Sequence, residues 1–200
     1  KKSKARFQDS FHRLTTIEKP EGRLQLISYY DDKPQSCNFG RVRSLSSCFD
    51  KNQKPQLTHR FEYRFKYGDG SYFKNEVKEG TTIVYDAYDN KTTYQFDTCH
   101  RLDKVEKYLD NSLYTTEKMK WSNSKSIQSG RLLSKTLSDS NNKVLKQLLY
   151  TYDDAGNVIC KTLLGNLCAF GSQDKYQESY TYSNDGFNLL ETITKGSGLQ

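Results

Sequence analysis

Residues 150–159 read YTYDDAGNVI, and this stretch decides the fold of the chain. Tyr150 and Tyr152 are separated by one residue, so both rings lie on one face of an extended segment. The Asp153 side chain can accept a hydrogen bond from a backbone amide two residues on, and Gly156 can adopt a positive φ without steric cost. A β-branched run begins at Val158. The stretch therefore predicts a β-hairpin: a strand, a short turn and the next strand.

The same pattern returns at residues 180–189, which read YTYSNDGFNL. Tyr180 and Tyr182 again stand two positions apart, and Gly186 follows the second tyrosine at the same offset as in the first copy. We expect a second hairpin here, built on the same arrangement of aromatic residues and a glycine turn.

A more divergent copy lies at residues 94–102, which read YQFDTCHRL. It keeps the two aromatic residues, Tyr94 and Phe96, and the aspartate that follows them, Asp97. His100 occupies the position of the glycine. This copy therefore predicts the same reversal, although histidine tolerates a left-handed backbone less well than glycine does.

Two further turns, at residues 85–90 and 139–144, carry Asp89 and Asn142 at the glycine position. Aspartate and asparagine are the residues other than glycine that most readily adopt the left-handed conformation. Both turns are therefore expected to keep the same backbone geometry.

The shared pattern is aromatic-x-aromatic-Asp-x-x-Gly-Arg/Asn-Leu/Val, and it resembles the YD repeat of the bacterial RHS family. Teneurins and the shell-forming subunits of insecticidal Tc toxins share this repeat. The resemblance covers residues 85–196 well and residues 26–70 more loosely. We therefore assign residues 81–200 to RHS/YD repeats and residues 1–80 to a loosely repeat-like β segment, and we expect the chain to be a fragment of a longer polypeptide.

The rest of the sequence also favours strands. Residues 61–67, FEYRFKY, alternate aromatic and charged side chains with a period of two, whereas a helix would spread these aromatics around its whole surface. Turn-forming residues recur at positions 86, 97, 110, 122, 139 and 153. This spacing predicts an all-β chain, an antiparallel meander of short hairpins with almost no helix. The resemblance implies that this meander is an open arc of a hollow, spiralling shell.

Composition limits the function classes. Only 34% of the residues are hydrophobic and the mean hydropathy is −0.90, but 15 Tyr and 10 Phe supply large amphipathic contact areas. No apolar run is long enough for a membrane span. The net charge of +7 is unevenly placed: residues 1–66 hold 15 Lys and Arg against seven Asp and Glu, a balance of +8, and the remaining residues contribute −1. Because these cations are scattered rather than grouped in a block, we predict no nucleic-acid partner.

The cysteines, Cys37, Cys48, Cys99, Cys160 and Cys168, form no C-x-x-C pair, and their odd number argues against a disulfide framework or a zinc site. We expect free thiols packed as small hydrophobic groups. A bridge between Cys37 and Cys48, or between Cys160 and Cys168, remains an alternative.

No motif predicts catalysis, a metal site or a cofactor. The three histidines lie far apart in sequence and lack a metal-binding spacing: His12, His59 and His100. Two aspartates such as Asp153 and Asp185 could imitate a glycosidase pair, but a turn role explains every copy of the aspartate at once. We therefore predict that the chain is not an enzyme and that the residues of the recurring pattern have an architectural role.

The resemblance implies a function in containment. In the family, the shell encloses a variable C-terminal toxin or effector and serves its delivery. The expected partners are then the remainder of the chain's own polypeptide and an enclosed C-terminal effector, and the expected location is the secreted or envelope-associated space of a bacterium. Two alternatives stay open: a module that binds cell-surface glycans through its aromatic faces, and, less favoured, a glycosidase-like enzyme.

Overall fold

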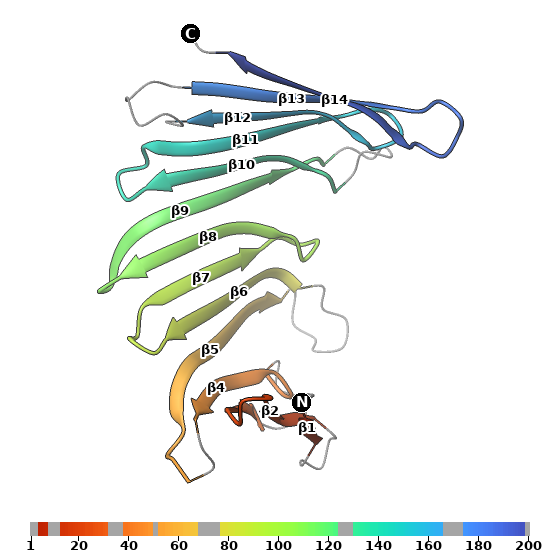
Figure 1. The fold of residues 1–200 in the computed structure, drawn as a ribbon. Coiled ribbons are helices and arrows are strands. Elements are labelled where there is room, and N and C mark those ends of the chain that lie inside the picture. The colour runs from red at the N-terminus through yellow and green to blue at the C-terminus, as the bar shows by residue number, and fades with distance from the viewer. Residues whose placement is uncertain are drawn as a thin grey trace. The chain divides into compact units, whose positions relative to one another are not determined.

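The computed structural model describes residues 4–7, 13–31, 38–49, 52–67, 77–123, 130–165 and 174–198 (Figure 1). Within these ranges every regular element is a β-strand, and there is no helix. The strands are β1 (Lys4–Phe7), β2 (Leu14–Glu18), β3 (Leu24–Tyr29), β4 (Val42–Cys48), β5 (Gln56–Tyr67), β6 (Val77–Asp86), β7 (Lys91–Phe96), β8 (Leu102–Leu109), β9 (Ser112–Trp121), β10 (Leu132–Asp139), β11 (Val144–Tyr152), β12 (Val158–Gly165), β13 (Asp174–Tyr182) and β14 (Leu190–Gly198).

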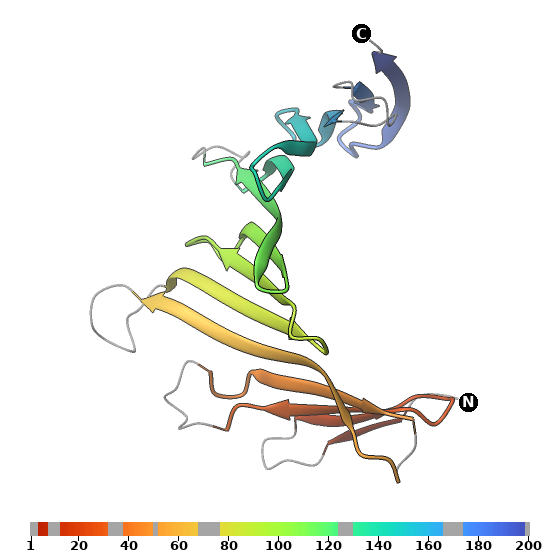
Figure 2. The same cartoon turned by 90° about the vertical axis from the view of Figure 1, so that its left-hand side faces the viewer.

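The chain folds as two compact units. The N-terminal unit holds residues 1–101 and 108–112, and the C-terminal unit holds residues 102–107 and 113–200. Strands β1 to β7 follow one another as antiparallel neighbours in the first unit, and β9 to β14 do so in the second. Figure 2 shows β3 to β6 side by side from a second direction. The predicted all-β antiparallel meander is therefore confirmed for the residues that the structure describes.

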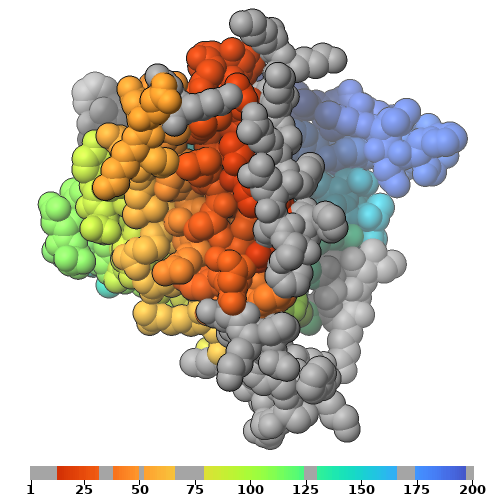
Figure 3. All heavy atoms as spheres, turned by 90° about the horizontal axis from the view of Figure 1, so that it is seen from below, coloured from red at the N-terminus to blue at the C-terminus, as the bar shows by residue number. Residues whose placement is uncertain are grey.

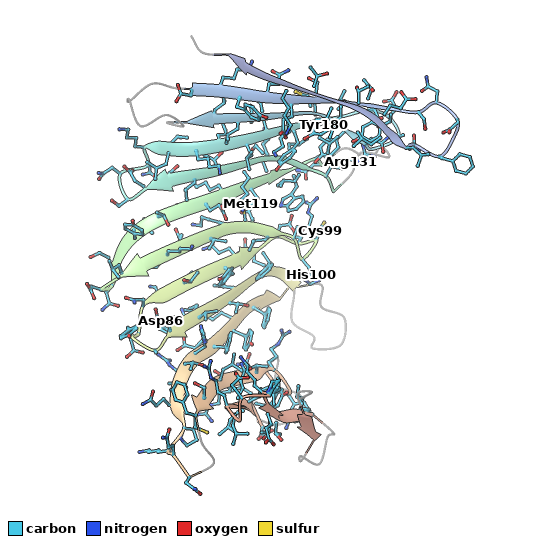
Figure 4. The ribbon with its side chains drawn as sticks, in the orientation of Figure 1. Asp86, Cys99, His100, Met119, Arg131 and Tyr180 are labelled. Atoms are coloured by element: carbon cyan, nitrogen blue, oxygen red, sulfur yellow. The ribbon has the colours of Figure 1, made fainter. Side chains whose placement is uncertain are left out.

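Successive reversals lie at opposite ends of the strands, as an antiparallel meander requires. In the N-terminal unit, Figure 4 places Asp86, the last residue of β6, at one end of the strands, and Cys99 and His100, in the reversal after β7, at the other end. Every second reversal therefore lies at the same end of the strands. Residues in two such reversals, about two strands apart in sequence, are neighbours there.

Alternation along the strands gives each unit two chemically different faces. On β5, the rings of Phe61, Tyr63 and Phe65 share one face, and the register pairs them with Val84, Thr82 and Gly80 of β6. Glu62 and Arg64 lie on the opposite face. β5 also begins earlier than the aromatic run, at Gln56. The strand predicted for residues 61–67 is thus confirmed and longer than expected.

The sheet buries few side chains. Among the described residues, the buried apolar side chains are Cys48, Ile83, Val105 and Met119, at 6–8% exposure. Large apolar side chains such as Phe187 (77%) and Tyr114 (63%) are mostly exposed. Hydrophobic burial is usually the dominant stabilising force in a folded domain. Because little apolar surface is buried here, hydrogen bonds and ring contacts between strands contribute an unusually large share of the stability.

Among the described residues there is no helix with the length and hydropathy to cross a membrane. The division predicted at residue 80 concerns the quality of the repeats and stays a prediction, since the two compact units are defined by packing rather than by sequence pattern.

Candidate functional site

The reversal after β7 shows how the aspartate of the repeat works. Asp97 and Arg101 close the loop through a bond from the Asp97 amide to the Arg101 carbonyl (2.9 Å). The Oδ1 atom of Asp97 accepts hydrogen bonds from the amides of Cys99 (2.8 Å) and Arg101 (2.9 Å), and Oδ2 accepts one from Arg101 Nε (2.8 Å). The side chain therefore satisfies backbone donors that a tight turn leaves without partners.

Three other reversals repeat this geometry. The first residue in each is Asp86, Asp139 or Asp153, and its amide donates to the carbonyl of the residue four positions later at 3.0–3.1 Å. In the last of these, Asp153 Oδ1 accepts from the amides of Gly156 (2.6 Å) and Asn157 (2.8 Å). The sequence predicted that Asp153 would accept a hydrogen bond from a backbone amide two residues later. The amides that donate to it belong instead to residues three and four positions later.

These bonds hold Asp86, Asp97 and Asp153 in their charged form. The side-chain hydrogen bond from Asn90 lowers the pKa of Asp86, and that from Asn157 lowers the pKa of Asp153. Burial opposes the shift at Asp97, yet the hydrogen bonds from Arg101 and Cys99 keep the pKa of Asp97 below its usual value. Each carboxylate is thus an acceptor for turn amides, which stabilises the ionised form.

The fourth residue of these reversals has a positive φ in every case. The values are 60° for Asp89, 59° for His100, 63° for Asn142 and 99° for Gly156. A left-handed residue at this point, after a type I turn, matches the twist of the flanking strands. The predicted equivalence of the four positions is confirmed, including the less favoured histidine.

A second recurring feature links one reversal to the next along the same edge. The Tyr152 hydroxyl, at the end of β11, donates to the carbonyl of Leu132, the first residue of β10 (2.7 Å). Tyr182, at the end of β13, donates in the same way to Val158, the first residue of β12 (2.9 Å). We call such a bond, from an aromatic side chain to the first carbonyl of the preceding strand, an aromatic clamp.

Three more aromatic clamps occur in the described part of the chain. The indole Nε1 of Trp121, at the end of β9, donates to Leu102 at the start of β8 (2.8 Å). In the N-terminal unit, Tyr29 donates to Leu14 (2.7 Å), and Tyr63 donates to Val42 (2.9 Å). The acceptors begin β2 and β4. Five strands therefore bond, through an aromatic side chain, to the exit of an earlier reversal.

The arginine before the acceptor residue adds further contacts between the two reversals that a clamp connects. Arg131 precedes Leu132, and its guanidinium carbon lies 5.4 Å from the centre of the Tyr152 ring. Its Nη1 donates to the Asp153 carbonyl (3.2 Å), and the guanidinium lies so close to Gly156 that a Cβ there would overlap it. The arginine of one repeat thus contacts the tyrosine, aspartate and glycine of the next.

The same pairing recurs in the N-terminal unit. Arg13 lies 4.5 Å from the centre of the Tyr29 ring, and Arg41 lies 5.3 Å from that of Tyr63. Cation–π contacts of this kind contribute about 0.5–1 kcal/mol at exposed sites. The arginine and the aromatic residue therefore act together at these clamps.

The remaining predicted residues lie in or beside this framework. Tyr94 pairs with Thr82 in the register of β6 and β7, and Phe96 pairs with Gly80. The Phe65 ring packs on Gly80 so closely that a Cβ added to this glycine would lie 3.3 Å from the ring. Tyr150 pairs with Lys161. Gly186 has a φ of 85° in the longer reversal after β13.

Tyr180 belongs to a separate cluster around Glu178. The Tyr180 hydroxyl (2.7 Å) and Lys161 Nζ (3.1 Å) both donate to Glu178 Oε2, and Tyr176 donates to Oε1 (3.3 Å). The hydrogen bond to Glu178 raises the pKa of Tyr180 to about 12. The sequence grouped Tyr180 with the turn, whereas the structure places its hydroxyl in this ion-pair cluster on β12 and β13.

Sequence reasoning missed the partners that complete the clamps, which are Tyr29, Tyr63, Trp121, Arg13, Arg41 and Arg131. A signal for them was present: an Arg-Leu, Arg-Val or Asn-Val pair stands 15–24 residues before each aromatic donor. In the repeat pattern this pair directly follows the turn, and nothing in the pattern shows the aromatic residue that later bonds to it.

Among the described residues no cluster of His, Cys, Asp and Glu has the arrangement of a metal site. Cys48, Cys99 and Cys160 carry free thiols there, and Cys48 is buried. The two possible bridges involve Cys37 and Cys168, which lie outside the described residues.

No known family model matches the sequence, and no curated protein is similar to it. Among solved structures, the chain is similar to the crystal structures of TcdB2-TccC3-TEV and of TcdB2-TccC3, each with 13% identity and a TM-score of 0.25. The matches cover 98% of this chain and 15% of those chains. A TM-score of this size carries no structural argument, so the functional proposal depends on the chain's own residues.

Proposed function

We propose that this chain is a wall segment of an RHS-type shell that encloses a C-terminal effector of the same polypeptide. The observation that carries the proposal is the aromatic clamp, as in Tyr152 with Leu132. The residues of the repeat pattern have structural contacts: the aspartate accepts hydrogen bonds within the turn, and the tyrosine and arginine bond one reversal to another. Such a sheet can be extended by further repeats without a core of its own.

The low burial supports a wall rather than a globular domain built around its own hydrophobic core. In a repeat sheet each strand forms its hydrogen bonds with the next strand, so the sheet does not require a central core. Its two faces can contact solvent or enclosed polypeptide. The exposed apolar side chains of the C-terminal unit, such as Ile159 (39%) and Ile193 (51%), suit a surface that adjoins other polypeptide.

The state of the aspartates supports a role without catalysis. A general acid needs a carboxyl group whose pKa is raised toward neutrality. The hydrogen bonds in the reversals shift the pKa of Asp97 and Asp153 in the opposite direction. We therefore propose a protein that is not an enzyme, whose partners are the rest of its polypeptide and the enclosed effector, and which is secreted or held at the envelope of a bacterium.

The test uses the polypeptide as its host makes it. An antibody against residues 81–200 would detect the native product, and the proposal requires a chain much longer than 23.2 kDa. The purified product would then be treated with protease, with and without mild denaturant. We expect the region C-terminal to these repeats to survive only while the sheet is folded.

Two outcomes would reject the proposal. One is a native product that ends close to these residues. The other is a C-terminal region that protease removes at the same rate whether or not the sheet is folded. A Tyr114→Phe variant, altered at an exposed ring, serves as the control that should protect as the wild type does.

A further inference from the structure

The last described strand, β14, is open on the side that faces away from β13, and we call this side its outer edge. β14 pairs with β13 along its whole length, and Figure 1 shows no described strand on the other side. Residues 190–196 are all exposed, whereas every residue of β12 except Ile159 is half-buried or buried between β11 and β13. In the space-filling view of Figure 3, the blue atoms of the β13–β14 hairpin project from the C-terminal unit. In the described part of the chain, β14 is therefore an edge strand whose outward backbone groups have no strand partner.

The start of β14 repeats the backbone geometry at which an aromatic clamp is received. The register of β13 and β14 shifts between Thr181 and Tyr182, and Tyr182 lies opposite Leu190. The register of β11 and β12 shifts in the same way and places Tyr152 opposite Val158. The carbonyl of Val158 accepts the clamp from Tyr182, at the end of the strand that pairs next. Leu190 therefore holds in β14 the position that the clamp acceptor Val158 holds in β12.

The same relation holds at three other clamp acceptors. These are Leu14 opposite Phe7, Val42 opposite Tyr29 and Leu132 opposite Trp121, each beside a register shift. Each of these carbonyls accepts a hydrogen bond from a tyrosine of the strand that pairs next. The position is thus a repeated docking point for the side chain of a following strand.

The start of β6 shows what such a strand needs at its end. Val77 lies opposite Tyr67 beside a register shift, as the clamp acceptors do. The following strand, β7, ends in Phe96, whose ring carries no hydrogen-bond donor. A clamp therefore requires that the following strand supply a tyrosine or a tryptophan.

The side chains at the start of β14 are apolar. The carbonyl of Leu189 accepts the hydrogen bond that closes its reversal, as that of Arg131 does before β10. Arg131 lies over the Tyr152 ring, whereas Leu189, which is 61% exposed, offers an apolar surface at the equivalent position. Leu190 (50%) and Ile193 (51%) are also exposed. An aromatic ring placed on Leu189 would remove this apolar surface from water, which stabilises the contact.

We propose that the outer edge of β14 binds a further antiparallel strand that ends in Tyr or Trp, whose side chain donates a hydrogen bond to the Leu190 carbonyl. The inference rests on the proposed function, in which the wall continues through another repeat of the same polypeptide. It specifies the direction of the added strand, the residue at its end and the carbonyl that receives it. Backbone hydrogen bonds along β14 would supply most of the affinity, as in other cases of strand addition to a sheet edge.

A second copy of the chain is a poorer occupant of this edge. Its first strand, β1, has four residues and ends in Phe7, which has no side-chain donor. Its β14 ends in Gly198 and contains no aromatic residue. Pairing of two copies through either strand would leave the Leu190 carbonyl without a clamp.

The test uses a synthetic peptide with the sequence of β13, residues 174–182, because this strand occupies the equivalent edge of β12. A fluorescent label on its N-terminus reports binding to the 200-residue chain by anisotropy, and amide hydrogen exchange of the chain locates it. We expect saturable binding below about 1 mM peptide and slower exchange at residues 190–198. The Tyr182→Phe peptide should bind about fivefold more weakly, since it lacks the clamp donor. The Tyr176→Phe peptide, which carries the same change elsewhere, is the matched control and should bind as the unaltered peptide does.

Four results would overturn the proposal. They are no saturable binding up to about 1 mM peptide, protection in β12 rather than in β14, equal affinities of the two Phe peptides, and self-association of the chain through β14 that the peptide does not reverse. These outcomes are separate from those of the protease experiment on the native product. An effector that is protected although the peptide does not bind would reject the docking edge alone, whereas peptide binding without protection would reject the wall.

Discussion

The hydroxyl of Tyr152 donates a 2.7 Å hydrogen bond to the carbonyl of Leu132, and the arginine before that carbonyl, Arg131, lies over the Tyr152 ring. Two residues of one repeat therefore contact one residue of the next. This relationship explains why the tyrosine, the aspartate, the glycine and the arginine recur together: each one has its partner in the same repeat or in a neighbouring one.

The first prediction concerns the hydroxyl of this aromatic clamp. Tyr152→Phe keeps the ring but removes the donor, and it leaves the Leu132 carbonyl without that partner. We expect a loss of about 1 kcal/mol in the free energy of unfolding, measured with urea. Tyr114→Phe, at a ring that is 63% exposed, should change it little. Equal effects of the two substitutions would contradict a specific role for the clamp.

The second prediction compares two glycines with similar backbone conformations. Gly156 has a φ of 99° and Gly186 a φ of 85°, so alanine is strained at either position. A Cβ at residue 156 would also displace the Arg131 guanidinium, whereas one at residue 186 meets nothing within 4 Å. We expect Gly186→Ala to cost about 1 kcal/mol and Gly156→Ala clearly more, in the same urea measurement. A smaller cost at residue 156 would mean that Arg131 is not held there.

The third prediction concerns acid. Hydrogen bonds lower the pKa of Asp97 and Asp153 in the folded chain below the ordinary value of 3.8. The unfolded chain therefore binds protons first as the pH falls, and the stabilisation, complete above about pH 5, is lost as the pH passes through the folded pKa values. The free energy of unfolding should fall over this range. Asp97→Asn/Asp153→Asn should show a flatter profile, and a profile as steep as that of the wild type would contradict the assignment.

The fourth prediction concerns base. The hydrogen bond to Glu178 raises the pKa of Tyr180 from 10.0 to about 12. This contribution is complete below the unfolded value and is lost as the pH rises from there through the folded value. The phenolate absorbance that disappears in Tyr180→Phe should therefore titrate late in the wild type and earlier in Glu178→Gln. Titration of Tyr180 near 10 in both proteins would show that the bond is absent in solution.

The sequence predicted the fold well because the strand signal is local. Period-two alternation at residues 61–67 and the left-handed positions of Gly156, Asn142 and Asp89 depend only on nearby residues, and the structure contains them. The acceptor role of the turn aspartates is local too, since Asp97 and Asp153 accept hydrogen bonds from amides within four residues.

What the sequence did not reveal depends on the register between distant strands. The partner of Tyr152 lies 20 residues away, and the partner of Tyr182 lies 24 residues away. No local pattern selects one backbone carbonyl among many. The role of Tyr180 was missed for another reason: the repeat pattern grouped it with the turn, although its hydrogen-bond partner Glu178 lies only two residues away on the same strand.

The central claim is that aromatic clamps hold successive reversals together, and amide hydrogen exchange tests it most directly. In Tyr152→Phe, the amides at the start of β10, residues 131–134, should exchange faster than in wild type, although the substitution lies in β11. In Tyr114→Phe they should exchange as in wild type. Unchanged exchange at residues 131–134 in Tyr152→Phe would contradict the claim.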